Sequence, residues 1–124
     1  MTDGNKEAAI SFLQMASRGM VRAAYSKYIG SGFKHHNAFF EGSADALMAA
    51  MEENARQNPG KELLVKHVIG EGDLVAVHAH VKLKMDDPGT ALVHIFRFEK
   101  GKVVELWDLG QRVPDNSPNQ FGMF

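Results

Sequence analysis

Apolar and polar residues alternate most clearly over residues 92–111, LVHIFRFEKGKVVELWDLGQ. A period of two in both halves of this stretch predicts two β-strands joined by a tight turn at Lys100-Gly101. Lysine is a poor residue for the first positive-φ position of a two-residue type I′ turn. We therefore expect a three-residue loop, Glu99–Gly101, that pairs Phe98 with Lys102.

This register divides the hairpin into two faces. One face carries a mostly apolar set: Leu92, His94, Phe96, Val104, Leu106 and Asp108. The other carries Val93, Ile95, Arg97, Glu105 and Trp107. The first face thus holds a titratable pair, His94 and Asp108, and the second an expected structural ion pair, Arg97 with Glu105. A two-residue loop would instead separate Asp108 from His94 and put it beside Arg97.

The first half of the chain has helical periodicity. Residues 5–18 predict an amphipathic helix that Gly19 ends, and residues 21–29 predict a second, which leads to a turn at residues 30–32. Residues 33–40, FKHHNAFF, follow no regular pattern. Ser43 is a good N-cap for a third helix, which the Asn-Pro-Gly sequence at 58–60 ends.

The second half changes to strand periodicity. Residues 62–69 and 74–85 predict strands, with turns at 70–73 and 86–89. Helices followed by strands indicate one α+β domain, residues 1–124, in which a curved antiparallel sheet carries the N-terminal helices on its concave face. Such a cone encloses a pocket. Phe121, Met123 and Phe124 are expected to dock, over this subunit's pocket or a partner's.

Composition narrows the class of protein. Apolar residues make up 44% and charged residues 23% of the chain, as in ordinary globular domains. A formal charge of -1 gives no reason to expect nucleic acid, and the absence of cysteine excludes disulfides. No apolar run reaches the roughly 20 residues that span a bilayer, and the N-terminus is polar. We expect a cytoplasmic protein with no membrane partner.

Two further histidines, His78 and His80, lie two apart on a predicted strand and so point the same way. Together with His94 and Asp108 they could supply three nitrogens and one oxygen to a metal. The sequence has no ligand pair at helical i,i+4 spacing, however, and no His-Glu-x-x-His motif. We therefore expect polar pocket residues, no metal and no cofactor.

Four segments carry a family resemblance: FKHHN, VAVHAHV, HIFRFEKGKVVELWDLGQ and the tail NQFGMF. In this order the chain resembles the SnoaL-like polyketide cyclase group of the nuclear transport factor 2-like superfamily. The resemblance implies a helical cap over a sheet, frequent dimerisation, and a pocket that in characterised members performs intramolecular aldol cyclisation of polyketide esters.

The resemblance also implies roles for residues. Asp108 matches the general acid/base of the cyclases, His36 with Asn37 matches a His-Asn pair near the cavity mouth, and His78 matches a strand histidine. Relatives usually have aspartate at position 94, here His94, and histidine at position 106, here leucine. His94 can therefore partner Asp108, and the leucine makes the site drier.

These observations lead to a hypothesis about function. Asp108, in an apolar setting that disfavours its charged form, would take a proton from a carbon next to a carbonyl and return it, as an aldol cyclase or isomerase does. His78 or His94 would orient it or donate to the oxyanion. The expected ligand contacts are His36, Asn37, His80, Phe96, Leu106, Met48 and Met51.

Two other hypotheses remain open on the sequence. The first is a non-catalytic module that binds a small apolar ligand, and the second is an epoxide hydrolase or dehydratase on the same fold. In each case we expect a homodimer formed through Val93, Ile95 and Trp107.

Overall fold

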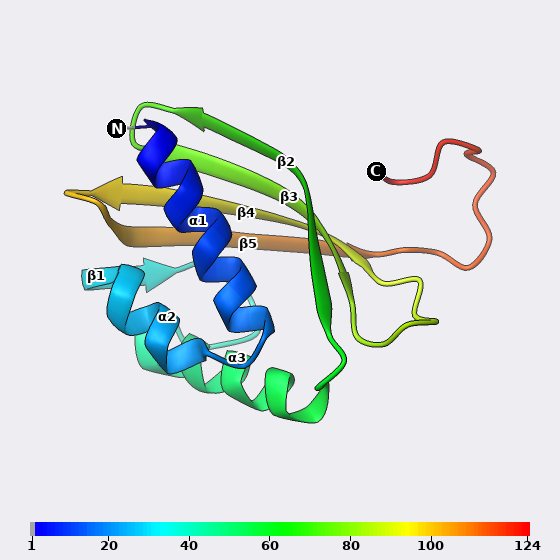
Figure 1. Ribbon diagram of the computed structural model, residues 1–124, viewed down its shortest axis with the longest axis horizontal. Coiled ribbons are helices and arrows are strands. Elements are labelled where there is room, and N and C mark those ends of the chain that lie inside the picture. The colour runs from blue at the N-terminus through cyan, green and yellow to red at the C-terminus, as the bar shows by residue number, and fades with distance from the viewer. Residues whose placement is uncertain (1) are drawn as a thin grey trace.

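A computed structural model, which describes residues 2–124, shows three helices and five strands (Figure 1). In chain order they are α1 (Thr2–Ser17), α2 (Val21–Tyr28), β1 (Ile29–His35), α3 (Ala44–Gln57), β2 (Glu62–Glu71), β3 (Leu74–Lys82), β4 (Thr90–Glu99) and β5 (Lys102–Arg112). The strands form one curved, open sheet in the order β1-β5-β4-β3-β2. Helix α1 crosses one face of the sheet, over β2 and β3, and α2 and α3 lie beside β1. The predicted α+β architecture is confirmed.

The sheet is mixed and not wholly antiparallel as expected, because β1 pairs in parallel with β5 while the other neighbours are antiparallel. The sequence prediction of a turn at residues 30–32 and an irregular stretch after it was wrong here. Gly30 explains the error. A Cβ at this position would lie 3.0 Å from the Cβ of Lys102, so the glycine permits β1 to approach β5 closely.

The three predicted helices form. Helices α2 and α3 end within one residue of the prediction, whereas α1 begins at Thr2, three residues earlier than expected. Ser43 caps α3, where its hydroxyl accepts a hydrogen bond from the amide of Ala46 at 3.2 Å. Asn58 is the C-cap residue, and Pro59 follows where the helix can no longer continue. These ends fix the direction in which the chain leaves α3 for β2.

The β4–β5 loop differs from the prediction. His94, Phe96, Leu106 and Asp108 share a face as predicted, but Val103 joins that face in place of Val104. Glu99 pairs with Lys102, so the loop has two residues, and Lys100 adopts a positive φ of 52°. A β-bulge then places one extra residue, Val104, in β5. The bulge shifts the pairing by one residue, so that His94 and Asp108 again share a face, and the two residues lie directly opposite each other.

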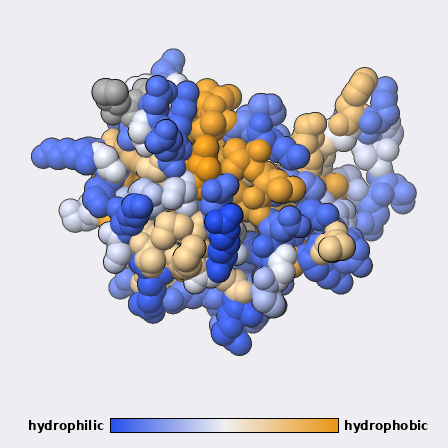
Figure 2. All heavy atoms as spheres, viewed as in Figure 1, coloured by the Kyte–Doolittle hydropathy of each residue, from blue (hydrophilic) through white to orange (hydrophobic). Residues whose placement is uncertain are grey.

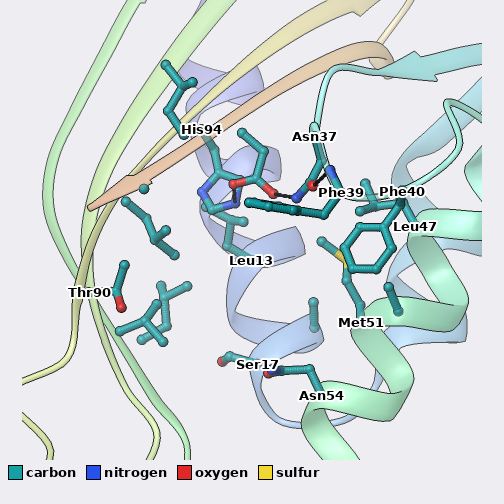
Figure 3. A pocket seen from close by; sticks show the side chains of 18 of the residues that line it. Leu13, Ser17, Asn37, Phe39, Phe40, Leu47, Met51, Asn54, Thr90 and His94 are labelled. Atoms are coloured by element: carbon teal, nitrogen blue, oxygen red, sulfur yellow. Dashed lines mark hydrogen bonds and ion pairs between the residues drawn. The ribbon is translucent and has the colours of Figure 1, made fainter. Parts of the chain in front are cut away.

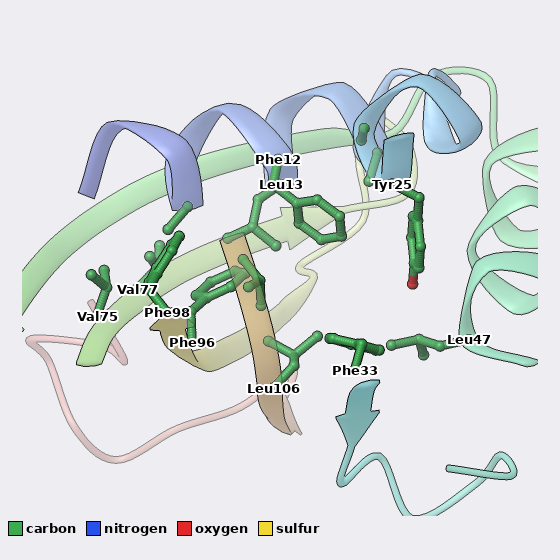
Figure 4. Close-up of a cluster of buried hydrophobic side chains, with 14 of the residues drawn as sticks. Phe12, Leu13, Tyr25, Phe33, Leu47, Val75, Val77, Phe96, Phe98 and Leu106 are labelled. Carbon is green, nitrogen blue, oxygen red and sulfur yellow. The ribbon is translucent and has the colours of Figure 1, made fainter. Parts of the chain in front are cut away.

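The hydrophobic core lies between α1 and the sheet (Figure 4). Phe12 of α1 is completely buried, and its ring meets that of Phe96 edge-on at 6.0 Å between centroids. The other large buried side chains come from every layer: Leu13, Tyr25, Phe33, Leu47, Val75, Val77, Phe98 and Leu106. On β3 the buried residues are the odd-numbered ones, which determines where the strand's histidines point.

The face of the molecule that carries α1 is mostly polar, with its hydrophobic side chains gathered along β2 (Figure 2). Among residues 2–124 no helix has the length and apolar character that crossing a membrane requires.

The segment after β5 leads to the outer face of the sheet, the face that the helices leave uncovered. There the ring of Phe124 stacks on His80 at 4.2 Å and on His78 at 5.6 Å, and Lys66 lies over it. The expected docking of the tail thus holds for Phe124, whereas Phe121 is 80% exposed. The contact is not over this subunit's cavity.

Phe124→Ala is therefore expected to lower the free energy of unfolding by about 1 kcal/mol, because the ring is only partly buried. Ligand affinity should stay unchanged. Denaturant unfolding and ligand titration of Phe124→Ala and of the control Phe121→Ala measure both. A loss of ligand affinity in the Phe124 variant alone would contradict this placement of the tail.

Candidate functional site

A cavity of about 900 Å³ lies between α1, α3 and the concave side of the sheet (Figure 3). Most of its wall is apolar, with contributions from Leu13, Ala16, Leu47, Ala50, Met51, Leu63, Val81, Leu83 and Leu92. The polar residues in the lining include Asn37, Asn54, Lys61, His94 and Asp108. Phe39, which is 88% exposed, also lies on the lining and marks where the cavity opens to solvent. A cavity of this size with a largely apolar wall and polar side chains that converge on it is typical of a small-molecule site.

Asp108 of β5 projects into this cavity and is held from the loop after β1. Asn37 Nδ2 donates to Asp108 Oδ2 at 2.8 Å, and Asn37 Oδ1 accepts from the amide of Phe39 at 2.9 Å. The second bond fixes which way the Asn37 amide faces, so its N–H group is always directed at the carboxylate. The Asp108 side chain is 15% exposed, which leaves it accessible from the cavity.

The loop that carries Asn37 is itself braced by His35. The His35 ring is buried. Its Nδ1 accepts a hydrogen bond from the backbone N–H of Asn37 at 3.1 Å, and its Nε2 contacts the backbone carbonyl oxygen of Glu41. Because Nδ1 accepts, the ring proton resides on Nε2, where it can donate to that carbonyl. The end of β1 and the loop after it thus support the Asp108 contact.

His94 faces Asp108 across the β4–β5 pair, with 3.3 Å between His94 Nε2 and Asp108 Oδ1. The histidine is only 4% exposed, and its Nδ1 has no hydrogen-bond partner among residues 2–124. Burial lowers the pKa of His94 below its usual value. The negative charge of Asp108 opposes this shift, and the positive charge of Lys61 adds to it. His94 is therefore a neutral imidazole beside the carboxylate.

Sequence comparison places the chain in no family, since no protein-family model and no curated protein matches it. The fold does have solved relatives. AclR, a proposed hydroxylase from Streptomyces galilaeus, is 24% identical, with a TM-score of 0.75 over 90% of this chain and 81% of that chain. A proposed SnoaL-like polyketide cyclase from Jannaschia sp. CCS1 is 20% identical, with a TM-score of 0.70 over 90% of this chain and 88% of that one.

An NTF2-like protein from Cytophaga hutchinsonii is 17% identical, with a TM-score of 0.69 over 86% of this chain and 89% of that chain. The chain therefore has an NTF2-like fold. The fold predicted from the resemblance is thereby confirmed. At these identities the likeness concerns the fold, so the chemistry rests on this chain's own residues.

Two of the predicted site histidines lie outside the cavity of this NTF2-like fold. His78 pairs with Val93, and the residues on either side of His78 and His80 are the buried ones. Both histidines therefore face outward. His78 Nδ1 lies 2.9 Å from His67 Nδ1, and His80 Nε2 lies 2.7 Å from the Pro88 carbonyl oxygen. The prediction that His78 and His80 lie beside Asp108 was wrong, because the strand register turns both side chains to the outer face.

His36 touches the lining of the cavity, but its ring is engaged on the outer face. His36 Nε2 lies 2.6 Å from Glu105 Oε2, and the ring stacks on Trp107 with 5.1 Å between centroids. Glu105 also accepts from Arg97 Nε at 3.1 Å, which confirms the predicted ion pair. Hydrogen bonds from His36 and Arg97 lower the pKa of Glu105. This group ties the Asn37 loop to β5.

Of the four apolar residues expected to contact a ligand, one lines the cavity and three do not. Met51 lines the cavity, next to Leu47 on α3. Phe96 and Leu106 are completely buried in the core, and Met48 packs against that core. Met48, Phe96 and Leu106 therefore belong to the core and do not line the cavity.

Sequence reasoning missed several residues that line the NTF2-like cavity. Phe39 and Phe40 lie on the irregular loop, where two adjacent phenylalanines were an available signal. Asn54 is on the polar side of a predicted helix, and Lys61 is in a turn. No periodic pattern distinguishes these two residues from ordinary surface residues.

Proposed function

We propose that this protein is a cofactor-independent enzyme that removes a proton from a carbon next to a carbonyl, as an isomerase or an aldol-type cyclase does. The observation that carries the proposal is Asp108. It is a carboxylate in an apolar cavity, held by an asparagine amide on one oxygen and faced by a neutral histidine on the other. A positioned carboxylate of this kind is suited to general base catalysis.

In the proposed reaction Asp108 takes the proton as the C–H bond breaks, and the electron pair passes into the enolate. In an isomerisation the protonated carboxyl group of Asp108 returns the proton to another atom of the enolate. In a cyclisation the enolate carbon attacks a second carbonyl of the same molecule, and the proton goes to the resulting alkoxide. Both routes return Asp108 to its starting form.

Asn37 and His94 act as positioning residues in this proposal. Asn37 holds Oδ2 of Asp108 at 2.8 Å, and His94 Nε2 lies 3.3 Å from Oδ1, so the two residues fix the position of the carboxylate in the cavity lining. His94 adds no full charge that would neutralise the carboxylate, because its own burial keeps it deprotonated. Replacing either residue should lower kcat more than it raises KM.

The function is tested by identifying what the cavity holds. Small molecules released from the purified protein are identified by mass spectrometry and then incubated with fresh protein. We expect a product of equal mass for an isomerisation or an aldol addition, or a product that has lost one water for a condensation. A ligand recovered unchanged would indicate a binding module instead.

We also propose that two copies associate through the outer face of the sheet. Val93, Ile95 and Trp107 are half-buried there, and Ile69 and Leu74 on the same face are 65% and 40% exposed. Apolar side chains gathered on one sheet face are typical of an interface between subunits.

Trp107→Glu is expected to weaken such a dimer at least tenfold in analytical ultracentrifugation, because it puts a charge in the buried centre. Met85→Glu, which changes an exposed residue between β3 and β4, should have no effect. A wild-type protein that sediments as a monomer at micromolar concentration would refute the proposed interface.

A further inference from the structure

Lys61, like Asp108, lines the cavity. It follows α3 in a turn that its amide closes by donating to the Asn58 carbonyl at 3.0 Å. Its ammonium group donates to Asn54 Oδ1 at 2.6 Å, and both residues line the cavity. Figure 3 shows Asn54 at the end opposite Asn37 and His94. The cavity therefore has a carboxylate at one end and an ammonium group at the other.

The charge of Lys61 is not matched by an acidic side chain. Among residues 2–124 no carboxylate lies within ion-pair distance of its ammonium group. The other charged residues of the lining have partners: Glu53 is bound by Arg56 and Gln57, and Arg112 donates to Asp87. Lys61 differs from them, since an ammonium has three donors and one is used.

The environment of Lys61 favours an anion close by. Partial burial lowers the pKa of Lys61, whereas the negative charge of Asp108 opposes that shift. A cation that has lost part of its water regains stabilisation from a negatively charged oxygen, and charge-assisted bonds are stronger than neutral ones. The Asn54 amide supplies an N–H donor at the same place, with its oxygen already directed at Lys61.

We propose that Lys61 and Asn54 form a subsite for a carboxylate group of the ligand. This inference rests on the proposed function for the other end of the molecule, where the reacting carbon lies at Asp108. It defines the substrate class: a largely apolar carbonyl compound with a free acid at the end remote from the reacting carbon. An ester or amide in place of the acid would leave the ammonium without its anion.

The test compares two probes of the same shape, 1-naphthylacetate and its neutral amide, 1-naphthylacetamide. Dissociation constants are measured by isothermal titration calorimetry near neutral pH. For the wild-type protein we expect the acid to bind at least about tenfold more tightly than the amide, the ratio that one charge-assisted bond contributes.

Lys61→Met should abolish this preference and leave the affinity for the amide within about twofold. Lys61→Arg keeps the charge and should retain part of the preference. The control is Lys66→Met. It removes a lysine of β2 whose side chain lies over Phe124 on the outer face, and it should behave as wild type. Lys61→Gln provides a second neutral variant if the methionine variant does not fold, as judged by circular dichroism.

Equal affinity for acid and amide in the wild type, undetectable binding of the acid, or a preference that persists in Lys61→Met would each overturn the subsite. The readout is binding alone. A protein without proton-abstraction activity can still show the preference, and an active enzyme can lack it, so failure of the subsite and failure of the proposed reaction are distinguishable.

Discussion

Replacement of Asp108 by asparagine is expected to reduce turnover by roughly 10²–10⁴-fold, the usual contribution of a general acid or base. The fold should persist, because an amide oxygen at position 108 can still accept the hydrogen bond from Asn37. Ligand affinity should change little, since the side chain keeps its size and stays in the same cavity. The loss should therefore fall on kcat, measured with the ligand that the protein itself retains.

The matched control is Asp86→Asn, which neutralises an exposed carboxylate in the β3–β4 connection. It should leave kcat, KM and the melting temperature at wild-type values. If Asp108 were only an ion-pair residue, Asp108→Asn would lower the melting temperature and leave turnover intact. That pattern would remove Asp108 from the mechanism.

A second large effect concerns acid stability and depends on His94. Burial lowers the pKa of His94 in the folded protein, so below its ordinary value of 6.5 the unfolded chain binds more protons than the folded one. The free energy of unfolding should therefore fall as the pH drops below about 6.5, by about 1.4 kcal/mol for each unit of difference between the two pKa values. Above this window the contribution is constant.

His94→Leu isolates that contribution. The variant loses the titrating group and also the buried Nδ1 atom without a partner, so its stability at pH 8 should equal or exceed that of the wild type. Below pH 6.5 its unfolding free energy should fall less steeply than that of the wild type. The unfolding free energies of both proteins are measured by urea denaturation across this pH range. Parallel slopes for wild type and His94→Leu would show that His94 is not the acid-sensitive group.

The hairpin shows why the face of a residue is easier to predict than its pairing partner. Alternation assigned His94 and Asp108 to one face correctly, because the core demands that pattern. The loop length was wrong, and the bulge at Val104 was not predicted, although two adjacent valines interrupt the alternation of the strand at this point. The two differences offset each other.

The histidines of β3 were misplaced for a different reason. A period of two shows that His78 and His80 share a face, but it does not say which one. Val75, Val77, Ala79 and Val81 occupy the other face, and their burial turns the histidines outward. The apolar partners along the same strand therefore carried the necessary signal.

Strand β1 and the Lys61 subsite could not be predicted from local patterns. Two glycines around Ser31 are a turn signal by composition, yet Gly30 is needed for close packing against β5. Lys61 reaches the cavity only because the turn after α3 brings it beside Asn54. Both depend on contacts between distant segments.

The central claim, that Asp108 abstracts a proton next to a carbonyl, is tested most directly by exchange with heavy water. A ketone that occupies the cavity is incubated in D₂O with wild-type protein or with Asp108→Asn at equal occupancy, and deuterium at the α-carbon is followed by NMR. We predict incorporation with the wild type at a rate at least about 10²-fold above that with Asp108→Asn. Equal rates for the two proteins, or no incorporation by the wild type with the ketone bound, would contradict it.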